Sequence, residues 1–229
     1  MTIGMNKETV GSVVAVVLVG VGGWYAFTSG SPGKGGGPAA AGAAATVAVV
    51  NGENIPRNQL DAVKAQLAAG QGQVATTTAA QAALEKQALD SVIGRTLLLQ
   101  AATQAGFTAS TTAVDAQIEA AKAQLGGQAG FDSMLVQQGL TEEGLRVQIS
   151  ENLAIQAYLE QELHLSTLTA TDAEVEAAYD QVSAGQQGLP ALSEVKEQMK
   201  QLVLGQKQQQ LIMAQVEKLR AAGSVHIII

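Results

Sequence analysis

Apolar residues recur every three or four positions through long stretches of this chain, which is the period of one face of an α-helix. One stretch begins near Leu84 and continues to Leu99, and Gly106 then supplies a C-terminal stop signal. A second stretch occupies Leu192–Ala222 and ends at Gly223. Because two helices of this length take up much of a domain, the sequence predicts a mainly α-helical fold.

Shorter helices are predicted around these two by their capping residues. A Ser or Thr before an apolar run accepts hydrogen bonds from the first backbone N–H groups, and a Gly after the run ends the helix. Thr171 and Glu174 have the spacing of a capping box. The expected helices follow Pro56 (with Leu60, Val63 and Leu67), follow Ser110 or Thr111 and stop at Gly126 and Gly127 (with Val114, Ile118, Ala121 and Leu125), span Phe131–Gln138 and stop at Gly139, and follow Thr141 and Thr171.

Two β-branched runs at opposite ends of the helical region predict a small sheet. Thr46–Val50 precedes Asn51-Gly52, the strongest short turn dipeptide, and Glu53–Ile55 follows it. The closing run Ser224–Ile229 is apolar and β-branched except at its start and at a single histidine. We expect it to pair with Thr46–Val50, so that the two ends of the domain meet.

Composition limits the classes of protein that this chain can belong to. Hydrophobic residues make up 47% of its 229 residues but aromatic residues only 3%, so the core must consist mainly of Ala, Leu, Val and Ile. The net charge of −7, with no cluster of Lys or Arg, lacks the electrostatic signature of a nucleic-acid-binding protein. No cysteine is present, which excludes disulfides and thiolate ligands.

The beginning of the chain predicts attachment to a membrane. Val10–Phe27 contains no charge and ends in an aromatic cluster, Trp24–Phe27, of the kind found at a headgroup interface. We expect an uncleaved transmembrane anchor, with a cleaved signal peptide as the alternative. Lys7 precedes the span, so the N-terminus should be cytoplasmic and the domain periplasmic or otherwise extracytoplasmic. The predicted organisation is a cytoplasmic segment (1–9), the anchor (10–27), a flexible linker of Gly, Ala and Pro (28–45) and the helical domain (46–229).

No constellation of side chains in the sequence indicates catalysis. His164 follows Glu160 by four positions, but one His and one carboxylate fall short of the three protein ligands of a typical zinc site. His226 is interpreted as an outward-facing or paired strand residue. No serine has a recognisable histidine partner, and no phosphate-binding glycine motif occurs. We therefore expect a protein that is not an enzyme and that uses no metal and no cofactor.

Four segments, Val47–Ile55, Ala88–Ala102, Gly139–Arg146 and Thr171–Asp180, occur in an order and spacing that point to one family. Together they resemble the N-terminal domain of the SurA, PrsA and PpiD group of periplasmic or cell-surface folding factors. The resemblance implies a multi-helix chaperone domain of the SurA N-terminal or trigger-factor type, with a small sheet that joins its terminal strands.

In that group a parvulin-type prolyl isomerase domain usually lies between the segment similar to Ala173–Asp180 and the closing helix. Here only Gln181–Pro190 stands in that place. This segment cannot supply the shell of His, Cys or Asp and aromatic groups that surrounds a prolyl ring in a parvulin site. The resemblance therefore implies the chaperone module alone, without isomerase activity.

The function implied by this resemblance is that of a membrane-anchored, ATP-independent holdase for unfolded or translocating polypeptides. With so few aromatic residues, client contact would depend on flexible apolar side chains, and Met adapts to varied partners. Core packing is the ordinary interpretation of each such residue, since apolar residues at helical spacing usually face the interior. The candidate client-binding residues are Phe131, Met134, Leu135 and Leu140 in the short helix region and Met199, Leu202 and Val203 on the last helix.

Two other functions stay open. The last helix has Gln-rich faces, such as Gln206 and Gln208–Gln210, that are polar without charge and are interpreted as solvated surface. A long helix of this kind on a flexible tether equally suits a membrane-tethered adaptor that docks one dedicated folded protein. A weaker alternative is a diverged prolyl isomerase with an unrecognised site.

Overall fold

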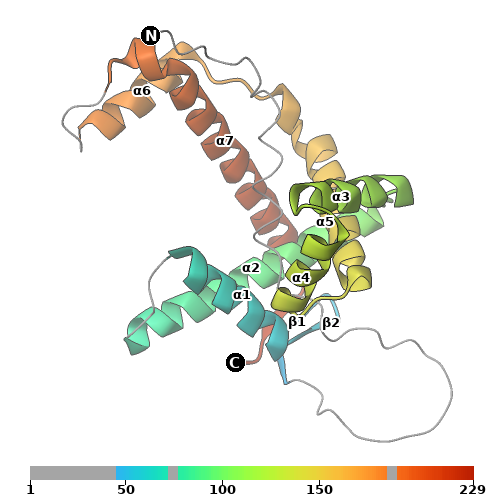
Figure 1. Cartoon of the computed structure of the whole chain (residues 1–229). Helices are drawn as coiled ribbons and strands as arrows, with labels where there is room; N and C mark the ends of the chain where they lie inside the picture. Colours follow the sequence, from blue (N-terminus) through green and yellow to red (C-terminus); the bar gives the residue numbers. More distant parts are fainter. Residues whose placement is uncertain (1–44, 72–76, 185–189) are drawn as a thin grey trace, which may run out of the picture. The chain divides into compact units, whose positions relative to one another are not determined.

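The computed structural model describes residues 45–71, 77–184 and 190–229 (Figure 1). The predicted cytoplasmic segment, the anchor and all but the last residue of the linker lie outside them. Among the helices that are described, none is long and apolar enough to cross a membrane. The described elements, in chain order, are β1 (Thr46–Val50), β2 (Glu53–Pro56), α1 (Arg57–Gln71), α2 (Thr78–Gln104), α3 (Thr111–Gln124), α4 (Gln128–Gln138), α5 (Glu142–Leu163), the 3₁₀ helix η1 (Leu165–Thr167), α6 (Asp172–Ser183), α7 (Leu192–Ala222) and β3 (Val225–Ile227).

This element order confirms the predicted mainly helical fold with a small sheet. The described residues form seven α-helices, and the bounds of α7 are those predicted from its periodicity. The caps formed as predicted at two helices: Ser110 Oγ accepts a hydrogen bond from the Ala113 N–H at 3.2 Å, and Thr141 Oγ1 accepts one from the Gly144 N–H at 3.0 Å. Capping side chains satisfy backbone N–H groups that have no partner within the helix.

The sheet has the strand order β2-β1-β3, with both pairs antiparallel. Asn51 (φ 51°) and Gly52 (φ 86°) both adopt the left-handed conformation that a two-residue hairpin turn between β1 and β2 requires. On the other edge of β1, Val49 lies opposite His226 and Val50 opposite Val225. The predicted pairing of the opening and closing runs is therefore confirmed, and β2 adds a third strand.

Pro56 differs from its predicted position in the first turn of a helix. It is the last residue of β2, opposite Thr46, and α1 begins at Arg57. The Arg57 N–H then bonds to the Ala45 carbonyl at 2.8 Å, so the strand pairing continues past the proline. A proline at a strand end loses no ladder hydrogen bond, which explains why the hairpin extends over it.

The chain forms two compact units. The first contains the described chain up to Ile93 together with Ala109–Asn152 and Val225–Ile229, and the second contains Gly94–Thr108 and Leu153–Ser224. The helices α2 and α5 contribute residues to both. The main buried residues of the first unit are Val47, Ala48 and Val50 of β1, Ile55, Leu60, Ala88, Val92 and Ile93, and, from α3 to α5, Val114, Ile118, Phe131 and Ile149.

Ion pairs join the helices of the first unit at its surface. Arg146 Nη1 of α5 donates to Asp115 of α3 at 2.6 Å, and the carboxylate raises the pKa of the guanidinium further above its ordinary value. Arg57 of α1 lies 3.1 Å from Glu85 of α2. These side chains remain partly exposed, so the pairs align helices more than they stabilise the fold.

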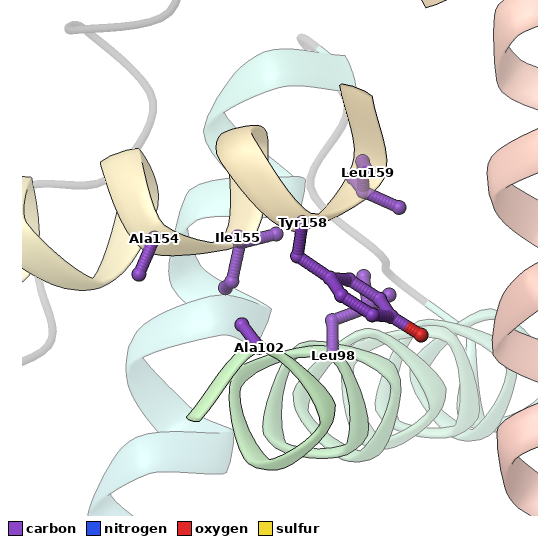
Figure 2. Packing of buried hydrophobic residues seen from close by; sticks show 6 residues of the cluster. All are labelled: Leu98, Ala102, Ala154, Ile155, Tyr158 and Leu159. Atoms are coloured by element: carbon purple, nitrogen blue, oxygen red, sulfur yellow. The ribbon is translucent and has the colours of Figure 1, made fainter. Parts of the chain in front are cut away.

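A cluster of buried side chains from α2 and α5 forms the interior of the second unit (Figure 2). Its six residues are Leu98, Ala102, Ala154, Ile155, Tyr158 and Leu159. Three residues of α7, Ile212, Val216 and Leu219, pack against this cluster and are partly buried. The C-terminal half of α7 is therefore held by apolar contacts.

Candidate client-binding surface

Five of the seven predicted client-binding residues lie in the interior. Phe131 is 0% exposed, and Leu135, Leu140, Met199 and Val203 are also buried. Core packing, the ordinary interpretation of such residues in the sequence, is what the structure shows for these five. A client cannot touch these side chains unless the surrounding helices open.

The other two predicted residues are more accessible. Met134 of α4 is half-buried, and Leu202 of α7 is 43% exposed. Met134 belongs to the first unit and Leu202 to the second, so neither unit by itself brings the α4 and α7 candidates together. Among the predicted residues, Leu202 is thus the one best placed to meet a client.

On the helices, sequence reasoning missed two strongly exposed apolar side chains. Val136 of α4 is 81% exposed, and Met213 of α7 is 60% exposed. Met213 follows Leu202 by eleven positions, which is just over three helical turns, so both project from the same face of α7. The spacing was available in the sequence, but periodicity alone does not tell which face of a helix is covered.

Between Leu202 and Met213 this face of α7 is uncharged. Gly205, Gln206 and Gln209 lie on the same face, and all three are exposed. The glutamines were interpreted as solvated surface, and the structure agrees for Gln206, Gln209 and the adjacent Gln210. The α7 face, defined as Leu202, Gly205, Gln206, Gln209 and Met213, extends about 16 Å along the helix at 1.5 Å per residue.

A buried hydrogen bond fixes the rotation of α7 at its C-terminal half. Gln215 is 6% exposed, and its Nε2 donates to the Tyr158 hydroxyl of α5 at 2.6 Å. Figure 2 shows the Tyr158 ring against Leu98, with its hydroxyl at the rim of the cluster. Since Gln215 points inward, Met213 must point outward, two positions or about 200° away around the helix.

Polar contacts also hold α7 against α6, at a position eight residues before Gln215 (Figure 1). Lys207 Nζ donates to the Glu174 carboxylate at 2.7 Å and to the Thr169 carbonyl at 3.0 Å. Glu174 also accepts from the Thr171 N–H at 2.8 Å, in the capping box that the sequence predicted for α6. These hydrogen bonds, first that from Lys207 and then those from Thr171, lower the pKa of Glu174 from 4.5 to about 2.

Within the described residues, neither His164 nor His226 belongs to a group of side chains that could hold a metal ion. His164 is exposed and left-handed (φ 51°), and the Glu160 carboxylate accepts hydrogen bonds from the Ser166 N–H and hydroxyl. His226 is an exposed strand residue paired with Val49, as predicted. In the described part of the chain, no group of three His, Cys, Asp or Glu side chains is arranged to hold a metal ion.

The structure thus defines a helical module whose small sheet joins its first and last strands and whose longest helix presents an uncharged face with exposed apolar side chains. A family model described as the SurA-like N-terminal domain matches residues 5–159. This is more than half of the chain, and the protein belongs to that family. No curated protein matches the chain significantly.

Family membership indicates a chaperone-like role and polypeptides as the bound molecules. The match ends within α5, so α6, α7 and β3 lie beyond it. The resemblance proposed for Thr171–Asp180 therefore stays a prediction.

Proposed function

We propose that this protein is an extracytoplasmic, ATP-independent holdase that binds unfolded or translocating polypeptides and is attached to the membrane by residues 10–27. The observation that supports this most directly is the α7 face, in which Leu202 and Met213 are exposed on the long helix that follows the family-matched region. Unfolded chains expose apolar side chains. An uncharged face with apolar side chains can cover them whatever the charges of the client.

The expected affinity is low, which suits release. Covering a side chain that is only partly accessible, such as Leu202 at 43% exposed, stabilises a complex by only about 1 kcal/mol. Met213 contributes a similar amount and adapts its shape to different clients, because its side chain is unbranched. Glutamines at positions 206 and 209 can exchange hydrogen bonds with a client backbone in place of water.

The chain between α6 and α7 supports a module without isomerase activity. α6 ends at Ser183 and α7 begins at Leu192, so the interval is shorter than the ten residues expected from the sequence. Compact domains need about 50 residues or more, so no parvulin domain fits at this place. A prolyl-peptide assay tests the proposal: turnover above background that is abolished by mutation would instead identify a diverged prolyl isomerase.

Suppression of aggregation tests the holdase proposal. Light scattering from two unrelated, chemically unfolded clients is recorded with and without the fragment Thr46–Ile229, at near-equal molar amounts and after circular dichroism has established that the fragment is folded. Suppression with both clients is the expected result. A folded fragment that suppresses neither would contradict the proposal.

Paired variants then test the α7 face. Leu202→Ser together with Met213→Ser should weaken client binding by about tenfold or more, from about 1 kcal/mol per side chain. Val136→Ser on α4 is the matched control, since it removes a more exposed apolar side chain elsewhere. Equal losses in both proteins would mean that general surface hydrophobicity, rather than α7, captures the client.

The second candidate is an adaptor that docks one folded partner. It is favoured by the fixed rotation of α7, because the Lys207–Glu174 and Gln215–Tyr158 hydrogen bonds present one defined surface. Photo-crosslinking from position 206 separates the two functions. A holdase should crosslink to many unfolded chains, whereas an adaptor should crosslink to one folded protein.

A further inference from the structure

The second surface of interest is the free edge of β3. In the strand order β2-β1-β3, this strand bonds to β1 on one side and, among the described residues, to no strand on the other. The Ile228 N–H continues the ladder with a bond to the Val47 carbonyl at 2.9 Å. An unpaired strand edge is a template on which another strand can form.

The register shows which backbone groups point to this free edge. Because the Ile228 N–H bonds to Val47, the residues that exchange hydrogen bonds with β1 are His226 of β3 and Ile228, which follows the strand. Their neighbours alternate, so the N–H and C=O groups of Val225 and Ile227 point away from β1. The two-residue turn agrees with this: it directs the backbone of Val50 and Ala48 to β2 and leaves Val49 and Val47 to β3.

The side chains at this edge are apolar and accessible. Ile227 is 53% exposed, Ile228 60% and Ile229 53%, and Ser224–Ile229 contains no Lys, Arg, Asp, Glu or Pro. Ile227 lies on the same side of the sheet as Ala48, its partner in β1, which is fully buried. The interior that covers Ala48 therefore does not cover Ile227. Edge strands usually avoid pairing through charges, prolines or bulges, and this edge has none of the first two.

We propose that the free edge of β3 binds an extended, apolar segment of a client polypeptide by strand addition. The inference rests on the proposed holdase function and adds a second contact with a different chemistry. Its hydrogen bonds are made by backbone groups, which every sequence provides, and Ile227 and Ile229 select for apolar side chains on one face of the added strand.

The area of this edge argues against a second copy of the chain as the occupant. Burying all three isoleucines removes on the order of 300 Å² per copy, well below the roughly 800 Å² per partner of a stable interface. A short strand from an unfolded chain needs no stable interface, because it must later leave. The small area therefore fits a transient client better than a dimer.

The test uses the full chain in mild detergent and a fluorescein-labelled peptide of alternating valine and threonine. The control peptide has the same side chains but is N-methylated at every residue, which removes the backbone N–H donors on both of its edges. Fluorescence anisotropy should show binding that is about tenfold or more weaker for the N-methylated peptide. Equal affinity for both peptides would overturn the proposal.

Two proline variants test the edge from the side of the protein. Ile227→Pro removes an N–H that points outward and should abolish peptide binding with little loss of thermal stability, whereas Ile228→Pro removes the bond to Val47 and should lower the Tm. If Ile227→Pro binds the peptide as the unmodified chain does, the inference is wrong. Concentration-dependent dimers that Ile227→Pro abolishes would also overturn it, in favour of a second copy.

The two proposals fail separately in this design. If the unmodified chain suppresses aggregation and Ile227→Pro suppresses it equally and binds the peptide, the holdase function stands and the strand addition fails. If the unmodified chain binds the unmethylated peptide selectively but suppresses no aggregation, the strand addition stands and the holdase function fails.

Discussion

At the scale of single residues, two glycines within helices differ in how much room they leave for a side chain. A Cβ added to Gly130 of α4 would lie 1.9 Å from the carbonyl oxygen of Leu125, which is backbone and cannot turn aside. A Cβ added to Gly205 of α7 would meet nothing within 4 Å. Gly130 is therefore required by the close approach of the chain after α3, whereas Gly205 is not required by packing.

We expect Gly130→Ala to lower the free energy of unfolding by about 1–3 kcal/mol, the usual cost of overpacking. Gly205→Ala is its matched control, and it should raise that free energy by about 0.5–1 kcal/mol because alanine loses less backbone entropy in a helix. Urea denaturation followed by circular dichroism measures both. A Gly130→Ala protein as stable as the unmodified chain would show that the approach at Leu125 is not tight.

A second pair of residues tests how α7 is oriented. Tyr158→Phe should lower the free energy of unfolding by about 1–3 kcal/mol, because it leaves the Gln215 Nε2 buried without an acceptor. Adding Gln215→Met replaces the unpaired amide donor with an apolar side chain of similar volume. This second substitution should recover most of that loss. The coupling in this double-mutant cycle is the measured quantity, and additive effects would mean that the hydrogen bond does not form in solution.

At the scale of secondary-structure elements, the sequence predicted which helices and strands form, and where they end, better than it predicted which of their side chains are exposed. The bounds of α7 followed from its periodicity and Gly223, and the pairing of β1 with β3 followed from two β-branched runs. Which apolar side chains stay exposed did not follow, because Leu202 and Val203 are neighbours in one apolar pattern and only the packing of α7 separates them. Gln215 was similarly missed, since a buried glutamine depends on a partner in α5 that lies far away in the sequence.

The attachment of α6 to α7 should weaken at low pH. The pKa of Glu174 is lowered to about 2, so its ionised form stabilises the folded state in full above the ordinary value of 4.5. This contribution is lost as the pH falls from 4.5 through about 2, where the carboxylate takes up a proton and its bond to Lys207 weakens.

The Tm of the unmodified chain and of Glu174→Gln, recorded from neutral pH downward, measures this loss. The gap between the two proteins should be constant above pH 4.5 and should close toward pH 2. Glu176→Gln in the same helix is the control, since Glu176 is exposed and its substitution removes an equal charge. A gap that is independent of pH would mean that Glu174 acts through its cap geometry alone.

At the scale of the whole molecule, the proposed function combines two contacts of different kinds on separate units. The α7 face belongs to the second unit and the β3 edge to the first. The first contact covers client side chains and the second pairs with client backbone, so the two contacts use different groups of a client. Two weak contacts on one client raise the overall affinity without slowing the release of either contact.

Attachment to the membrane would place both contacts where polypeptides emerge. A Gly-rich linker of the length of residues 28–45 has a root-mean-square reach of roughly 20–25 Å, from about 5–6 Å multiplied by the square root of the number of residues. We therefore expect the full chain to stay with the membrane fraction after carbonate extraction, while the fragment Thr46–Ile229 stays in solution.

The intact mass of the extracted protein separates the two versions of this proposal: a mass that includes residues 1–45 supports an uncleaved anchor, and a mass that lacks them identifies a cleaved signal peptide. Release of the uncleaved chain by carbonate would contradict membrane anchoring, because a spanning helix resists conditions that strip surface-bound proteins.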